Sequence, residues 1–148
     1  MSGDFCSTTG YVFTLGGGAV CCRSKKQTII ANSTMEAELI DLASTSEETN
    51  WLRDLLFKIP YFQKPIPHIL IHCDSTGAIG RVQNHYYKGK SRPIRRKQSN
   101  VRSYLTSGAI NVDYVKSCDN LADPLMNVLT REKVWSTSRG MELKPKNP

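Results

Sequence analysis

The pattern of apolar residues at the start of the chain predicts a β-hairpin. Aromatic and β-branched side chains fill positions 11–15, three glycines follow at 16–18, and an apolar stretch resumes at 19–22. Aromatic and β-branched residues favour strands, whereas glycines accept the positive φ angles of turns. Three glycines leave the backbone free to adopt positive φ angles but offer no side chains for packing. We therefore expect a loop with a bulge here rather than a tight two-residue turn. The strand region should end at Ile29 and Ile30.

A long helix is predicted next. Ser33 and Glu36 have the spacing of a capping box, in which two side chains satisfy amides at a helix start. Apolar residues then recur at helical spacing as far as Leu56, and Pro60 ends the pattern. The capping role gives the Glu36 carboxylate a structural explanation.

The second half of the chain alternates short strands and helices. Residues 66–73 are apolar and β-branched and predict a buried strand, after which a short helix should span 78–82. Residues 109–115 alternate like another strand, and a helix that begins near Asn120 should reach Trp135. This order of elements predicts an α/β domain with a mixed sheet.

The composition indicates how many domains the chain has and in which cellular compartment it folds. The 148 residues are 39% hydrophobic and 22% charged, which fits one ordered domain, placed at 1–141, with a flexible tail at 142–148. The sequence contains no apolar run long enough for a membrane span, and its start lacks a signal-peptide pattern. Five cysteines without a C-x-x-C pair favour a reducing compartment. We therefore expect a cytoplasmic or nuclear protein with no membrane partner.

Positive charge is concentrated in one segment. The net charge is +7, and residues 75–112 contain no acidic side chain while Tyr86 and Tyr87 lie among their basic residues. Such a segment is either a solvated surface or a contact for nucleic acid. The tyrosines between the basic residues are compatible with stacking on bases, and both interpretations stay open. The candidate nucleic-acid-binding residues are Lys88, Lys90, Arg92, Arg95, Arg96 and Lys97.

Three carboxylates are candidates for chemistry. Phosphodiester hydrolysis by paired magnesium ions needs clustered Asp and Glu oxygens. Helical periodicity places Glu38 on the side that packs inward, where a charge is costly unless it is paired or metal-bound. Asp74 ends a predicted strand and Asp123 precedes Pro124, so each is explained more simply as a turn or cap residue.

Several stretches together resemble the RNase H domain of copia-type LTR retrotransposon Pol polyproteins. The match spans nearly the whole chain in order, and this chain looks like a truncated and diverged, plant-like copy of that domain. The matching stretches are residues 7–20, 23–28, 33–38, 73–74, 89–92, 120–125 and 140–141.

The resemblance implies a fold and a site. The family has a five-stranded mixed sheet flanked by helices, and four acidic residues that bind two Mg²⁺ ions and cut the RNA strand of an RNA–DNA hybrid. Three of these acids carry over as Glu38, Asp74 and Asp123, as catalytic residues and metal ligands. The fourth lies in the family's first, central strand, for which this chain has only residues 1–6. Asp4 falls in the loop that should follow that strand, and we assign it no catalytic role.

The missing strand and a changed helix are the main departures from the family. The neighbouring strands could close the gap directly, another segment could fill it, or a second chain could donate a strand, and we expect direct closure. Pro93 can begin a helix, but the run from Arg95 to Asn100 replaces a mixed apolar and aromatic face, so we expect weaker packing there.

These observations predict a degenerate, host-domesticated RNase H-like module. It should bind nucleic acid, an RNA–DNA hybrid foremost, bind Mg²⁺ weakly, and cut little or not at all, because a metal cluster works as a unit. One alternative is an active magnesium-dependent ribonuclease H whose missing strand is supplied in trans. The other is a protein-interaction or regulatory factor on the same scaffold.

Overall fold

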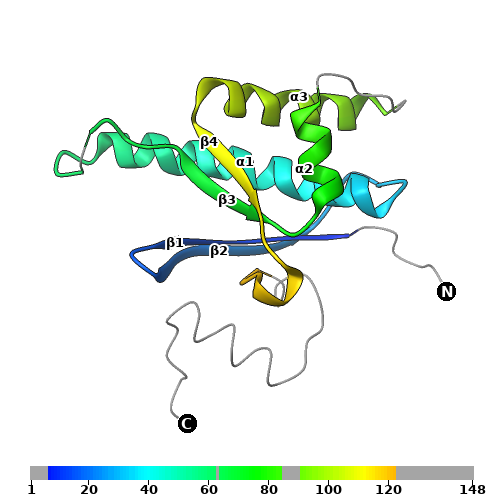
Figure 1. Ribbon diagram of the computed structural model, residues 1–148, viewed down its shortest axis with the longest axis horizontal. Helices are drawn as coiled ribbons and strands as arrows, with labels where there is room; N and C mark the ends of the chain where they lie inside the picture. Colours follow the sequence, from blue (N-terminus) through cyan, green and yellow to red (C-terminus); the bar gives the residue numbers. More distant parts are fainter. Residues whose placement is uncertain (1–6, 63, 85–90, 123–148) are drawn as a thin grey trace, which may run out of the picture.

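The computed structural model describes residues 7–62, 64–84 and 91–122 (Figure 1). Within these ranges lie three α-helices, one 3₁₀ turn and four strands in two small sheets, which confirms the α/β class. Several predicted features lie outside the described residues: Asp4, Lys88, Lys90, Asp123, the helix expected to reach Trp135, and the tail at 142–148.

The first sheet is the predicted hairpin. Strand β1 (Thr8–Leu15) pairs antiparallel with β2 (Gly18–Lys26). Gly16 and Gly17 join the strands with φ angles of 63° and 88°, values that glycine adopts without strain. The prediction of a longer loop is therefore wrong, because Gly16 and Gly17 alone connect the two strands in a tight turn.

The bulge that we expected at the turn lies inside the strands instead. The pairing register shifts between Phe13 and Thr14, where Val20 is the extra residue of β2. The second strand also ends at Lys26, earlier than predicted. The chain then crosses to the long helix.

Helix α1 (Thr34–Lys58) begins as its capping box predicts. The Ser33 hydroxyl accepts a hydrogen bond from the Glu36 amide at 3.2 Å. The Glu36 carboxylate accepts from the amide of Asn32 at 2.8 Å, one residue earlier than the ideal capping box. The structural explanation for Glu36 is thereby confirmed.

The remaining elements form the second sheet and two helices. Two parallel strands are joined through both helices, and a short turn follows the last strand. Their bounds are β3 Ile69–Cys73, α2 Thr76–Gln83, α3 Arg92–Ser107, β4 Ile110–Tyr114 and η1 Ser117–Asp119. The predicted strands and the short helix are thus present within two or three residues of their expected ends.

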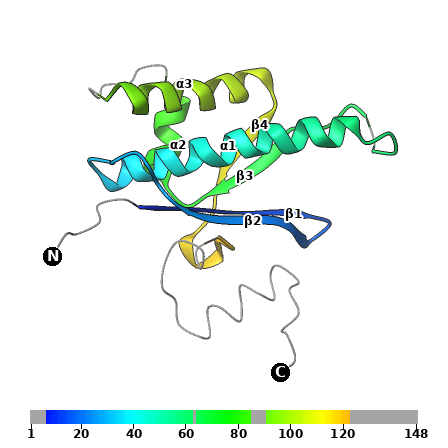
Figure 2. The ribbon, with the colours of Figure 1, turned by 180° about the vertical axis from the view of Figure 1, so that it is seen from behind.

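The core lies between α1, α3 and the second sheet. Figures 1 and 2 show α1 running between α3 on one side and the hairpin of β1 and β2 on the other. Ile94 and Val101 of α3 are fully buried, and Gln98 between them is also buried. We expected this helix to lose its packing face, and that expectation is wrong. Its buried residues recur every three or four positions, whereas Arg92, Arg95 and Arg96 are exposed.

The two sheets remain separate. Within the described residues, β1 pairs with β2 and β3 pairs with β4, and no ladder joins one pair to the other. Direct closure of the gap, which we expected from the resemblance, is therefore wrong. No helix in the described part of the chain is long and apolar enough to cross a membrane.

Candidate functional site

A cavity of about 350 Å³ lies at the gap between the two sheets. Its walls are β1 over residues 10–14 and the stretch 69–74 of β3 and its end. Helix α1 contributes Glu38, Asp41 and Thr45, among others, to the lining. Cavities of this size are in the range that holds ligands in proteins.

Two of the predicted site residues meet at this cavity. Glu38 is half-buried on the first turns of α1, and Asp74 follows directly after β3. Residues 119–122 also line the cavity, so the described chain reaches it immediately before Asp123. Asp123 itself lies outside the described residues, and its predicted role stays a prediction.

The simple cap explanation for Asp74 does not hold. The N-cap of α2 is Ser75, whose hydroxyl accepts a hydrogen bond from the Ala78 amide at 3.2 Å. Because Ser75 satisfies the helix start, Asp74 is not needed there. Its position at the carboxyl end of a strand, beside a cavity, is where ligands gather in open α/β sheets.

The structure adds a third carboxyl group that sequence reasoning missed. Asp41 lies one helical turn after Glu38 and lines the same cavity. Burial, together with the charges of Glu38 and Asp74, raises the pKa of Asp41 from 3.8 to about 7. The amide of Gly10 in β1 donates to this carboxyl group and opposes the shift. The spacing of three residues from Glu38 was the signal that could have revealed it.

The environment of the thiol beside this cluster favours its protonated form. Burial raises the pKa of Cys73 to about 11, and the neighbouring carboxylates act in the same direction. A thiol with such a pKa stays protonated near neutral pH, and only the thiolate is a good nucleophile or metal ligand. Cys73 therefore contributes packing and a weak contact to the Ser75 carbonyl at 3.8 Å.

The oxygen ligands are of the type that Mg²⁺ prefers, but their arrangement is incomplete. In the described ranges, no group of three acidic, histidine or cysteine side chains is placed so that it could hold a metal ion. The cluster of Glu38, Asp41 and Asp74 thus brings like charges together without forming such a group. These residues do not fit a magnesium centre by themselves.

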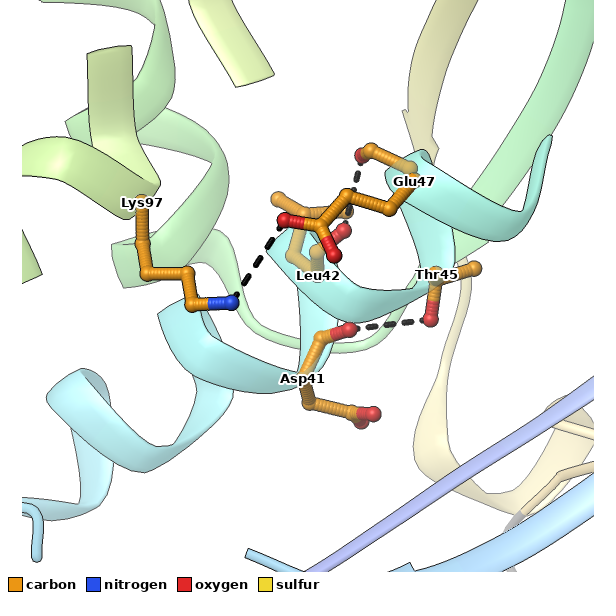
Figure 3. A network of polar contacts seen from close by, with 6 residues as sticks. Asp41, Leu42, Thr45, Glu47 and Lys97 are labelled. Carbon is orange, nitrogen blue, oxygen red and sulfur yellow. Dashed lines mark hydrogen bonds and ion pairs between the residues drawn. The ribbon is translucent and has the colours of Figure 1, made fainter. Parts of the chain in front are cut away.

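The predicted basic residues separate into two kinds. Arg92, Arg95 and Arg96 are exposed on the outer side of α3. Lys97 turns toward α1 and pairs with Glu47 at 3.5 Å, as Figure 3 shows. In the same view the Asp41 carboxyl points away from this pair. The arginines form an outer basic face, and Lys97 has a structural role between two helices.

Comparisons with known proteins find relatives among mobile elements. The chain is 34% identical over 136 residues to the retrovirus-related Pol polyprotein from transposon TNT 1-94 of Nicotiana tabacum. It is 33% and 34% identical to those from transposons RE2 and RE1 of Arabidopsis thaliana. These alignments cover 86% to 92% of the chain but only about a tenth of each relative.

Other comparisons add nothing to this picture. No family model matches the chain, and no solved structure matches it. The similarity is nevertheless consistent across three polyproteins and nearly the whole chain. The chain is therefore homologous to one segment of retrovirus-related Pol polyproteins from plant transposons, which supports a transposon-derived origin.

Proposed function

We propose that this chain is a degenerate RNase H-like module that binds nucleic acid, an RNA–DNA hybrid foremost, and cuts it little or not at all. The observation that carries the proposal is the exposed basic face of α3, formed by Arg92, Arg95 and Arg96. Lysine and arginine contacts to phosphates supply most of the affinity of non-specific nucleic-acid binding.

The separation of the basic and acidic groups supports binding. The buried residues of α3 hold the helix against α1, so Arg92, Arg95 and Arg96 are exposed without loss of packing. Glu38, Asp41 and Asp74 lie at the cavity between the sheets. A polyanion that contacts these arginines therefore stays away from the acidic groups of the cavity, which would repel it.

The incomplete acidic cluster supports the loss of cleavage. Two-metal hydrolysis needs ligands that hold both ions a few ångströms apart. The residues that we assign to this role are Glu38 and Asp74, with Asp123 as a further prediction. Asp41 brings additional negative charge, but burial favours its protonated form. We therefore propose that Mg²⁺ binds weakly, and we derive no catalytic step through it.

Fluorescence anisotropy with a labelled RNA–DNA hybrid tests binding. Replacing two exposed arginines, Arg92→Gln with Arg96→Gln, should weaken binding roughly tenfold near physiological salt. It should also lower the slope of log K against log salt by about 2, since each phosphate contact contributes about 1. The control with the same charge change is Lys58→Gln with Lys116→Gln, two exposed lysines outside α3. Equal losses in both double variants would contradict a specific role for α3.

Hydrolysis is tested with the same hybrid and added Mg²⁺. We expect no cleavage above background from the full chain. Cleavage that disappears in Asp74→Asn would overturn the inactive half of the proposal and favour an active nuclease. Hybrid binding that is absent at physiological salt, or unchanged when Arg95, Arg96 and Lys97 are neutralised, would favour a protein-interaction factor instead.

A further inference from the structure

A second cavity, of about 250 Å³, lies between the hairpin and α1. Its walls are parts of β1, residues 23–29 of β2 and its end, the stretch 40–48 of α1, and Lys97 of α3. We call this cavity the hairpin pocket. Among the described residues, Tyr11 alone lines both this pocket and the acidic cavity. The two cavities therefore use different functional groups.

The pairing of the hairpin strands places four side chains along this pocket. Thr9 lies opposite Lys25 in the antiparallel ladder. Tyr11 lies opposite Arg23. Residues that face each other in such a ladder put their side chains on the same side of the sheet, and all four line the pocket. The strand register thus fixes two cationic side chains at one wall.

Positive charge exceeds negative charge in the pocket, whose lining includes four basic residues and two acidic ones. The Arg23 guanidinium pairs with Glu48 at 3.2 Å. The Lys97 ammonium pairs with Glu47 at 3.5 Å (Figure 3). Both carboxylates are therefore neutralised inside the pocket. Lys25 is exposed and pairs with no carboxylate within the described ranges, so an anion is the favoured ligand.

Arg23 is oriented for such a ligand by two neighbours. Its Nη1 donates to Glu48, and the phenol oxygen of Tyr11 accepts a second hydrogen bond from the guanidinium. A guanidinium has five N–H donors, and this side chain is 51% exposed, so donors are left over for a ligand. Their planar arrangement matches the oxygens of a phosphate group.

A hydroxyl of α1 supplies a neutral donor. The hydroxyls of Thr45, Ser46 and Thr49 donate to the carbonyls four residues earlier in the helix. The Ser44 hydroxyl makes no such bond in the part of the chain that the structure describes. Ser44 is half-buried and lines the pocket. Because half-buried hydroxyls are normally hydrogen-bonded, an acceptor in the pocket is the expected partner of Ser44.

We propose that the hairpin pocket binds a phosphate group, with Lys25 and Arg23 as cationic contacts and the Ser44 hydroxyl as a neutral donor. A phosphate group has oxygens in several directions, which suits donors that come from a strand and a helix. It belongs either to a nucleic-acid backbone or to a free phosphate monoester. For the first source the inference rests on the proposed function, because Lys97 joins the pocket to α3.

Titration of the full chain with inorganic phosphate, followed by backbone amide NMR at constant ionic strength, tests the site. Saturable shift changes should appear in residues 23–28 and 40–48, and 5′-adenosine monophosphate should change the same amides. A titration without saturable changes would overturn the proposal. The same changes produced by sodium chloride alone would also overturn it, because they would show a general salt effect.

Two matched pairs of variants test the contacts. Lys25→Gln should weaken phosphate binding about fivefold, whereas Lys116→Gln, an exposed lysine elsewhere, should leave it unchanged. Ser44→Ala should weaken it about threefold. Thr45→Ala, at the next residue and in the other cavity, should leave it unchanged. Equal losses within either pair would overturn the assigned contacts.

Binding of the labelled RNA–DNA hybrid separates the two sources of the phosphate group. If the source is a backbone, Lys25→Gln should lower the salt slope of hybrid binding by about 1. If the source is a free monoester, Lys25→Gln should weaken only the binding of adenosine monophosphate. Arg92→Gln with Arg96→Gln should leave the phosphate titration unchanged, so failure of the pocket is distinguishable from failure of the α3 face. Loss of phosphate binding in that double variant would overturn a site in the hairpin pocket.

Discussion

Helix α1 presents two faces with opposite character. Toward α3 and the second sheet, Leu39, Ala43 and Ser46 are at most 2% exposed and pack in a dry core. Toward the gap between the sheets, Asp41 and Thr45 line an open cavity. The same helix is thus fixed by packing on one side and carries the candidate chemistry on the other. Its stability and its function can be changed separately.

The largest effect should follow loss of packing on the dry face. Ile94→Ala removes a fully buried side chain of α3 and leaves a cavity, which costs about 2 to 5 kcal/mol of unfolding free energy. Urea unfolding at constant pH measures the change. Ile30→Ala, the same substitution at a side chain that is 67% exposed, should change stability by less than about 0.5 kcal/mol. Similar costs at both sites would show that the core is not tightly packed.

The next effect concerns the cavity face and depends on pH. The pKa of Asp41 in the folded chain is about 7, above its ordinary value of 3.8, so folding favours the protonated form. The resulting stabilisation is complete below about pH 4 and is lost as the pH rises through 7. A pKa difference of this size corresponds to about 4 kcal/mol at most. Asp41→Asn should therefore match the unmodified chain at low pH and exceed its stability at pH 8.

Unfolding curves between pH 4 and pH 8 provide the measurement for Asp41→Asn. Asp54→Asn is the control, because Asp54 lies on an exposed part of the same helix. It should follow the unmodified chain throughout. A stability gain for Asp41→Asn that is constant with pH would contradict a titrating carboxyl group at the cavity.

A smaller effect is expected from a polar contact inside the dry face. The Gln98 amide group donates to the carbonyls of Arg81 at 2.8 Å and Asn84 at 3.2 Å, at the end of α2. Gln98→Met keeps most of the volume but removes both of these hydrogen bonds, while the Arg81 carbonyl keeps the Asn84 amide at 3.2 Å, so we expect a cost of about 1 to 3 kcal/mol. Thermal unfolding followed by circular dichroism should show the loss, and Gln83→Met on the exposed side of α2 should not.

Local sequence signals predicted the elements well. The capping box at Ser33 set the start of α1, and the apolar spacing in residues 66–73 and 109–115 located both strands of the parallel pair. These signals act within one turn or a few neighbouring residues, so they are readable without tertiary structure. Glu38 and Asp74 were assigned from the resemblance, and the structure places both at one cavity.

The failures concern properties that depend on distant residues. The bulge lies at the register shift between Phe13 and Thr14 and not at the glycines. The pairing register of a hairpin depends on how both strands pack, which local sequence does not show. Closure of the sheet was wrong because it depends on whether helix packing brings β1 and β3 together. Asp41 was missed although its spacing from Glu38 was visible, because only the fold shows that this side of α1 faces a cavity.

The smallest expected change in stability comes from a substitution on the cavity face of α1. It gives the most direct comparison of the two faces, because the matching substitution on the packed face is at the next residue. Thr45 lines the cavity, and its hydroxyl donates only to the Asp41 carbonyl within the helix, at 2.9 Å (Figure 3). Thr45→Leu should therefore change the unfolding free energy by less than about 0.5 kcal/mol, because the added atoms enter open space. Ser46→Leu places the same side chain in a site that is 0% exposed and should cost about 1 to 3 kcal/mol through overpacking. Equal effects in urea unfolding would mean that the cavity is closed in solution, and the distinction between the faces of α1 would be lost.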